Sequence, residues 1–261
     1  MIDIHSHLLP SLDDGASDWD EAIQMVQQAA ADGIHTIIAT PHHANGRYLN
    51  PASIVKDSVE EMNGRINRLG LDVTVLPGQE IRVYDRLLED LNEGELVSLN
   101  HSQYLLLELP SSRVPKHMEE LVHELSLLGI TPIIAHPERN ADIARDPGIL
   151  GSWVELGALA QLTAQSVSGQ NGKKLKGLSL ELIKDGAAHL IASDAHDIVR
   201  RPFYLSNAYE VIKHELGSEV EMYLRDNATR VVSNLPILLP TFTSSKSRDN
   251  PISKLFSIFN R

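Results

Sequence analysis

The feature that most constrains the fold of this chain is a regular alternation of short apolar runs with segments of helical periodicity. The apolar runs occupy residues 2–7, 35–40, 73–80, 104–110, 131–136, 158–163 and 189–194. Between them, stretches such as DWDEAIQMVQQAAADG repeat their apolar residues at helical spacing, and Gly33 follows as a helix cap. This alternation predicts β/α units around a parallel sheet, and 261 residues suit a single barrel of such units.

Residue types that bind metals recur at the carboxyl ends of these runs. In the opening MIDIHSH, residues two apart in a strand share a face, so Asp3, His5 and His7 are expected on one side. The strand ends in β/α barrels meet at one mouth, where active sites lie. We therefore expect the ends of these runs to form one cluster of metal ligands. The sixth run contributes none, and the expected ligands are His5, His7, His42, Glu80, Glu108, His136, Asp194 and His196.

The residue types in this cluster limit the metals that it can hold. The chain has no cysteine, so imidazole and carboxylate groups must bind the metal. The cluster offers more ligands than the four of one tetrahedral zinc, which predicts two or three divalent ions with a bridging carboxylate. Manganese, iron and zinc all suit such ligands, and paired ions of this kind support phosphoester hydrolysis.

Two arginines follow ligands at the same predicted mouth. Arg139 lies in AHPERN and Arg201 in SDAHDIVRRPF, and a guanidinium fork matches the oxygens of a phosphate group. We expect Arg139 and Arg201 to bind phosphate, whereas a solvated surface charge is the alternative for Arg200 or Arg201.

The loop SLDDGA holds a candidate general acid. Asp13 or Asp14 could protonate a leaving oxygen, although Asp14-Gly15 is equally a common turn pair. His43 is expected to point away from its neighbour His42. The other histidines lie at strand starts, in connections or in helices, where solvated or capping roles are expected: His35, His101, His117, His123, His189 and His214.

Charge and hydropathy exclude several classes of protein. The net charge of -12 argues against tracking a nucleic-acid backbone. Neither a signal peptide nor an apolar run long enough to span a bilayer is evident, so we expect a cytoplasmic protein.

Six motifs in order, IDIHSHLLPSLDDGA, ATPHHANGRY, GQEIRV, LLELP, IAHPERN and SDAHD, resemble the PHP (polymerase and histidinol phosphatase) superfamily. The resemblance is to its manganese-dependent bacterial protein-tyrosine phosphatases of the capsule and exopolysaccharide type, and covers about residues 1–238. It implies a distorted seven-stranded barrel with a trinuclear site, with Mn²⁺ expected and Fe or Zn as alternatives. By the resemblance, the eight residues above would be ligands, and Arg139 and Arg201 would contact phosphate. From their places at the predicted mouth we expect Asp14, His136 and Arg139 to be catalytic.

The resemblance also implies a reaction and a partner. A metal-bound hydroxide would attack the phosphorus of phosphotyrosine without a phosphoenzyme, since the thiolate mechanism needs a cysteine. The implied partner is a phosphorylated bacterial tyrosine autokinase with a tyrosine-rich tail, which acts in capsule or exopolysaccharide synthesis. The alternatives are a small-molecule phosphomonoesterase such as a histidinol phosphatase, and a non-catalytic metal-binding regulatory protein.

The expected organisation is one metallophosphatase barrel over residues 1–240 and a basic amphipathic tail over 241–261. In the tail, Ile252, Leu255, Phe256 and Phe259 would form one helical stripe. Such a tail suits contact with a membrane surface or with the kinase. A helix packed on the barrel, or a frayed end, is the alternative.

Overall fold

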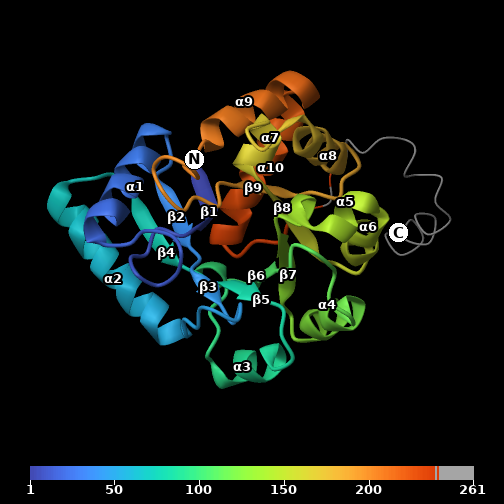
Figure 1. Cartoon of the computed structure of the whole chain (residues 1–261), viewed down its shortest axis with the longest axis horizontal. Helices are drawn as coiled ribbons and strands as arrows, with labels where there is room; N and C mark the ends of the chain where they lie inside the picture. Colours follow the sequence, from blue (N-terminus) through green and yellow to red (C-terminus); the bar gives the residue numbers. More distant parts are fainter. Residues whose placement is uncertain (239, 241–261) are drawn as a thin grey trace.

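The computed structural model of the chain describes residues 1–238 and 240 (Figure 1). All seven predicted strands are present, and two of them are interrupted. The strands are β1 (Ile2–Ser6), β2 (Thr36–Ala39), β3 (His42–His43), β4 (Thr74–Pro77), β5 (Glu80–Arg82), β6 (Tyr104–Glu108), β7 (Thr131–Ala135), β8 (Leu159–Thr163) and β9 (Leu190–Ala192). Pro41, which has no N–H for a ladder, lies at the first interruption, between β2 and β3. The predicted tail, 241–261, lies outside the described residues.

The strands form two parallel sheets that continue into each other. One has the order β1-β2-β4 and the other β3-β5-β6-β7-β8-β9. Because β2 leads into β3 and β4 into β5, the two broken strands join the sheets. The edge strands β1 and β9 also approach each other. Just past β9, Ala195 forms a parallel bridge to Ser6, and its carbonyl accepts the His7 N–H over 2.8 Å. The predicted α/β fold with parallel strands is confirmed.

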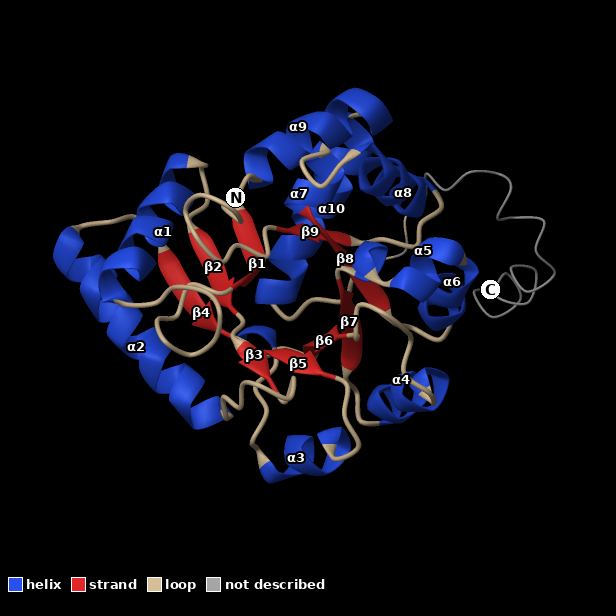
Figure 2. Cartoon of the chain, viewed as in Figure 1, coloured by secondary structure: helices blue, strands red, loops and turns tan. Residues whose placement is uncertain are grey.

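Helices surround the strands, which gather in the middle of the molecule (Figure 2). They are α1 (Trp19–Ala31), α2 (Ala52–Leu69), α3 (Leu87–Glu93), α4 (Met118–Leu127), α5 (Ala141–Arg145), α6 (Gly148–Glu155), α7 (Ala164–Ser168), α8 (Lys173–Lys184), α9 (Leu205–Leu216) and α10 (Ser218–Val232), with short 3-10 turns η1 (Leu99–His101) and η2 (Pro137–Arg139). The predicted first helix is confirmed: the Asp18 carboxylate caps it, and Gly33 follows with a φ of 84°. No helix among residues 1–238 is long and apolar enough to cross a bilayer.

The α10 helix packs against the strands from the side of their amino ends. Its residues Ala228 and Val231 share one apolar cluster with Ile4, Leu106 and Leu190 of the strands. Figure 1 shows α10 crossing the centre of the molecule behind the strands. The interior is therefore filled at this end with apolar side chains, which leaves the carboxyl ends of the strands for polar chemistry.

The solvated or capping role expected for His189 is wrong. His189 is completely buried just before β9. Its N–H donates to the Ala160 carbonyl over 2.9 Å, and its own carbonyl accepts from the Asn227 amide of α10 over 2.8 Å. The start of β9 is covered by α10, which a local reading of the sequence does not reveal.

We expect His189 to make the fold less stable in acid. Burial lowers the pKa of its imidazole from 6.5 to about 4. Between these pH values the unfolded chain binds more protons, so stability falls as the pH drops, by about 2 kcal/mol at pH 5. The His189→Gln variant lacks this proton uptake, so urea unfolding at pH 7 and pH 5 should show a smaller acid loss than in the native chain. Equal losses in both proteins would contradict the prediction.

Candidate metal centre

The structure gathers all eight predicted ligands at the carboxyl ends of the strands. The Glu80 carboxylate, which is fully buried at the start of β5, lies at their centre. Its oxygens lie 3.5 Å from His5 Nε2, 3.4 Å from His7 Nε2, 2.8 Å from His42 Nδ1 and 2.7 Å from His136 Nε2. Four histidines from three segments of the chain therefore face one carboxylate.

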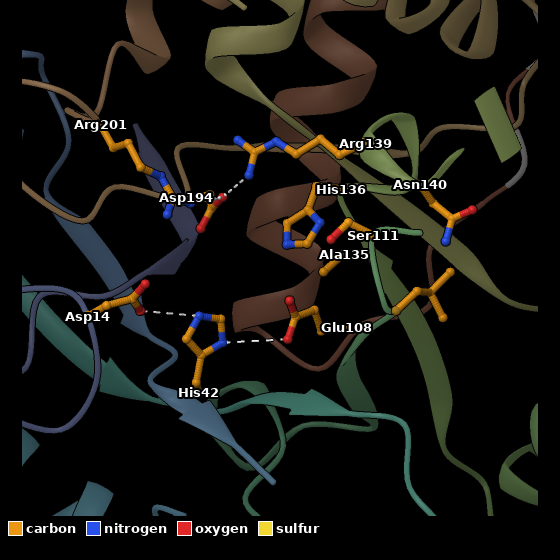
Figure 3. A pocket seen from close by; sticks show the side chains of 11 residues that line it. Asp14, His42, Glu108, Ser111, Ala135, His136, Arg139, Asn140, Asp194 and Arg201 are labelled. Carbon is orange, nitrogen blue, oxygen red and sulfur yellow. Dashed lines mark hydrogen bonds and ion pairs between the residues drawn. The ribbon is translucent and has the colours of Figure 1, made fainter. Parts of the chain in front are cut away.

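Asp194 is the second carboxylate that several of these histidines share. Its Oδ1 lies 3.4 Å from His5 Nε2, 3.3 Å from His7 Nε2 and 3.5 Å from His196 Nδ1. Glu108, at the end of β6, lies 3.6 Å from His42 Nδ1. Figure 3 shows His42, Glu108, His136 and Asp194 pointing into the same space.

The donor atoms form three overlapping groups, in each of which they lie within 4.8 Å of one another. The groups are His7, Asp14, His42 and His196; His5, His7 and Glu80; and His42, Glu80 and Glu108. Because His7, His42 and Glu80 each occur twice, the groups are neighbours in one cluster. Asp14 joins the first group, although the sequence predicted for this residue a general acid or a turn and not a ligand.

Buried atoms of the cluster lack partners that a cation would supply. Glu80 Oε2, Asp194 Oδ1 and His196 Nε2 are buried without a hydrogen bond among the described residues. The Nε2 atoms of His5 and His7 lie only 3.2 Å apart. Leaving buried polar atoms unpaired costs free energy, whereas nitrogen and oxygen donors at such spacing suit divalent ions. The residues present therefore fit a metal cluster.

Burial and neighbouring charges shift the pKa values of the two glutamates of the cluster in opposite directions. Burial opposes ionisation of Glu80, yet the positive charge of His42 and His5 holds its pKa well below the ordinary range. Burial and the charge of Glu80 together raise the pKa of Glu108. Burial next to His7 lowers the pKa of His196 to about 3, which keeps that imidazole neutral and able to bind a cation.

Groups behind the ligands hold the imidazole rings in position. His7 Nδ1 lies 2.6 Å from Asp13 Oδ2, which also accepts the N–H of His42 over 2.9 Å. His5 Nδ1 lies 2.8 Å from Gln161 Oε1 on β8. Partners of this kind fix the ring so that its other nitrogen faces the metal. The Asp13 side chain is buried and engaged with His7, whereas the Asp14 side chain is 45% exposed.

Two residues that contact predicted ligands, Gln161 and Arg82, were missed by the sequence analysis. Gln161 lies on the sixth predicted strand, the one without a ligand, and supports His5 instead. Arg82 follows Glu80 by two residues on β5, and its Nε and Nη2 lie 3.0 and 2.9 Å from Glu108 Oε2. His43 points elsewhere, as expected, with its Nδ1 2.8 Å from the carbonyl of Asn50.

Both predicted phosphate-binding arginines line a pocket of about 250 Å³ over the cluster, together with Asp14, His42 and Glu108 (Figure 3). Arg139 Nη1 lies 2.5 Å and Arg201 Nη2 2.6 Å from the same oxygen, Asp194 Oδ2. One carboxylate thus faces the histidines with one oxygen and aligns two guanidinium groups with the other. Arg200 does not line this pocket.

Comparison with known proteins agrees with the resemblance seen in the motifs. The family model described as capsular polysaccharide synthesis, CpsB/CapC, matches residues 1–233. The tyrosine-protein phosphatase YwqE of Bacillus subtilis (strain 168) is 42% identical over 259 residues, which cover 99% of this chain and 100% of YwqE. The putative tyrosine-protein phosphatase CapC of Staphylococcus aureus is 41% identical over 237 residues, which cover 90% and 92% of the two chains.

A solved structure shares the fold closely. It comes from work described as crystal structures of YwqE from Bacillus subtilis and CpsB from Streptococcus pneumoniae, unique metal-dependent tyrosine phosphatases. It superposes with a TM-score of 0.90 at 43% identity, and covers 92% of this chain and 97% of the other. The chain therefore belongs to the CpsB/CapC family of capsular polysaccharide synthesis.

Proposed function

We propose that the chain is a metal-dependent protein-tyrosine phosphatase. The observation that carries the proposal is the three overlapping donor groups beneath a pocket lined by Arg139 and Arg201. Relatives named as tyrosine-protein phosphatases match the chain at 41–42% identity over 90% or more of its length, which supports the same conclusion.

The proposed ligands are the eight predicted residues, with Asp14 added by its place in the first donor group. Two or three ions, Mn²⁺ by the resemblance and Fe or Zn as alternatives, would supply an activated water and neutralise phosphate charge. Glu80 is the proposed central ligand, because its oxygens face four histidines. His136 would act as a ligand that also lines the substrate pocket.

Arg139 and Arg201 are proposed to bind the phosphate group. Asp194 Oδ2 already holds both guanidinium groups, so little rotational freedom remains to be lost when the phosphate binds. The remaining N–H groups suit two oxygens of a phosphoryl group. Because the two arginine side chains lose little freedom and pair with the phosphate oxygens, they would stabilise the transition state, in which negative charge spreads over these oxygens.

Asp14 is proposed to move the proton in the reaction. Its side chain is 45% exposed at the pocket, so a substrate oxygen can approach it. Its contact with His42 holds its pKa below the ordinary range, so the carboxylate starts the reaction without a proton. We infer that water attacks phosphorus, that Asp14 takes up the proton released, and that this proton passes to the tyrosyl oxygen as its bond to phosphorus breaks.

The proposed substrate is a phosphorylated bacterial tyrosine kinase of capsule or exopolysaccharide synthesis. The family description and the names of the relatives support this choice. We further infer that residues 1–240 form one domain, a distorted seven-stranded barrel. The bridge between Ser6 and Ala195 supports closure, because it links the end of β1 to the segment after β9.

The test is hydrolysis of a phosphotyrosine peptide by chain that is stripped of metal and then supplied separately with Mn²⁺, Fe²⁺, Zn²⁺ or Mg²⁺. We expect phosphate release that requires metal, with two or three ions bound per chain. Histidinol phosphate serves as the matched substrate, and a preference for it would support the small-molecule alternative. Bound metal without turnover of either substrate would favour a regulatory protein and overturn the proposal.

A further inference from the structure

A second hollow opens directly beside the catalytic pocket. This groove, of about 620 Å³, is lined by the loop Asp197–Arg201 and by Glu21 of α1. It shares Asp14 and Arg201 with the catalytic pocket. A ligand that fills the pocket and extends past these two residues therefore enters the groove, which we call the Arg200 groove.

The loop that lines the Arg200 groove is held in one conformation by its first side chain. Asp197 Oδ1 accepts the N–H groups of Val199 over 2.7 Å, of Arg200 over 2.5 Å and of Arg201 over 3.4 Å. Such an Asx turn fixes the backbone locally. As a result the loop presents Val199 to solvent, with 78% of its surface exposed, next to the exposed Arg200.

The groove holds an arginine whose guanidinium group stays available to a ligand, beside the carboxylates of Asp14, Glu21 and Asp197. Glu21 Oε2 accepts from the Ser17 N–H and hydroxyl, both over 2.8 Å, and Asp197 is occupied by its own loop. Arg201 is paired with Asp194. Arg200 makes no ion pair within the described part of the chain. The exposed guanidinium group of Arg200 is therefore available to pair with an acidic side chain of a ligand.

We propose that the Arg200 groove binds the polypeptide segment next to the phosphotyrosine, with an acidic side chain of that segment at Arg200 and an apolar one at Val199. The inference rests on the proposed function and deepens it. A small phosphate ester fits within the pocket of about 250 Å³ and leaves the groove empty. A protein substrate must continue out of the pocket, and the groove is continuous with it.

The test compares phosphotyrosine peptides with aspartates or with lysines beside the tyrosine, and uses 4-nitrophenyl phosphate as a substrate too small to reach the groove. For Arg200→Ala we expect KM for the acidic peptide to rise about threefold, the size typical of an exposed charge contact. Arg200→Glu should raise it by about tenfold and lower KM for the lysine peptide, and Val199→Asp should also weaken the acidic peptide. Values of kcat, and turnover of 4-nitrophenyl phosphate, should stay unchanged.

Matched controls lie at the opposite ends of the strands. Arg68 of α2 precedes β4, and Leu127, 74% exposed, ends α4 before β7. Arg68→Ala and Leu127→Asp should leave all three substrates unaffected. Equal effects of Arg200→Glu on the two peptides, or an equal loss with 4-nitrophenyl phosphate, would overturn the groove proposal. Failure of the native, metal-loaded chain to hydrolyse any phosphotyrosine peptide would instead overturn the proposed function.

Discussion

Replacement of Glu80 by glutamine should reduce kcat/KM for a phosphotyrosine peptide by more than about 100-fold, since even the loss of a group behind a metal ligand costs about 10- to 100-fold. Glu80 is buried, and its two oxygens face His5, His7, His42 and His136. The amide has almost the same shape but no negative charge, so it binds divalent ions poorly. Metal content per chain, measured by mass spectrometry, should fall together with activity.

Glu138→Gln is the matched control for this substitution. Glu138 is also fully buried, but its Oε1 accepts the N–H and hydroxyl of Thr163 over 3.0 and 2.8 Å, outside the donor groups. An amide oxygen can keep both hydrogen bonds, so metal content should stay at the native level. If Glu80→Gln bound as much metal as the native chain and turned over normally, Glu80 would not be a ligand.

The clustering of the proposed ligands could be predicted from the sequence, because it follows from the parallel β/α architecture. Carboxyl ends of parallel strands meet at one end of the fold, so residues such as His5, Glu108 and Asp194 need only end a strand to become neighbours. The alternation of apolar runs was sufficient to place those ends within a few residues. No knowledge of how distant segments pack was needed for this step.

Contacts between distant segments were not predictable in the same way. His189 looked solvated because nothing near it in the sequence shows that α10 covers the start of β9. The role of Gln161 behind His5 depends on β8 lying next to β9, the strand that contacts β1. The choice between Asp13 and Asp14 depends on which of them reaches His7. Periodicity reports the face of an element but not its partner, so these assignments required the structure.

The break of the second predicted strand could be predicted only in part. Pro41 in ATPHH stands where a ladder N–H is missing, and it separates β2 from β3. His42 then pairs in register with Glu80 of β5, so the break moves the histidine toward the cluster. The signal was present in the sequence, but its consequence for ligand placement depends on which strand comes next to β3.

Gly15→Ala should disable the metal centre without changing any ligand. A Cβ at Gly15 would lie 1.8 Å from the carbonyl oxygen and 2.6 Å from the Cβ of His7. The Gly15 N–H also donates to Asp13 Oδ1 over 2.9 Å, and the next N–H, of Ala16, donates to the His7 carbonyl over 3.1 Å. An added methyl group must therefore push the loop away from His7 and pull Asp13 from its ring.

The expected cost is about 1–3 kcal/mol of stability, as for other overpacked sites, together with at least a tenfold loss of kcat/KM. Gly151→Ala provides the control, because nothing lies within 4 Å of a Cβ there and the residue is inside helix α6. In that position alanine should stabilise the chain slightly.

Thermal unfolding, metal content and turnover should be measured for both variants. Native metal content and activity in Gly15→Ala would show that the loop yields easily, and that the close approach of Gly15 does not position His7. Loss of metal with a fold that still unfolds cooperatively would instead show that the close approach of Gly15 positions His7, because none of the proposed ligands has been altered.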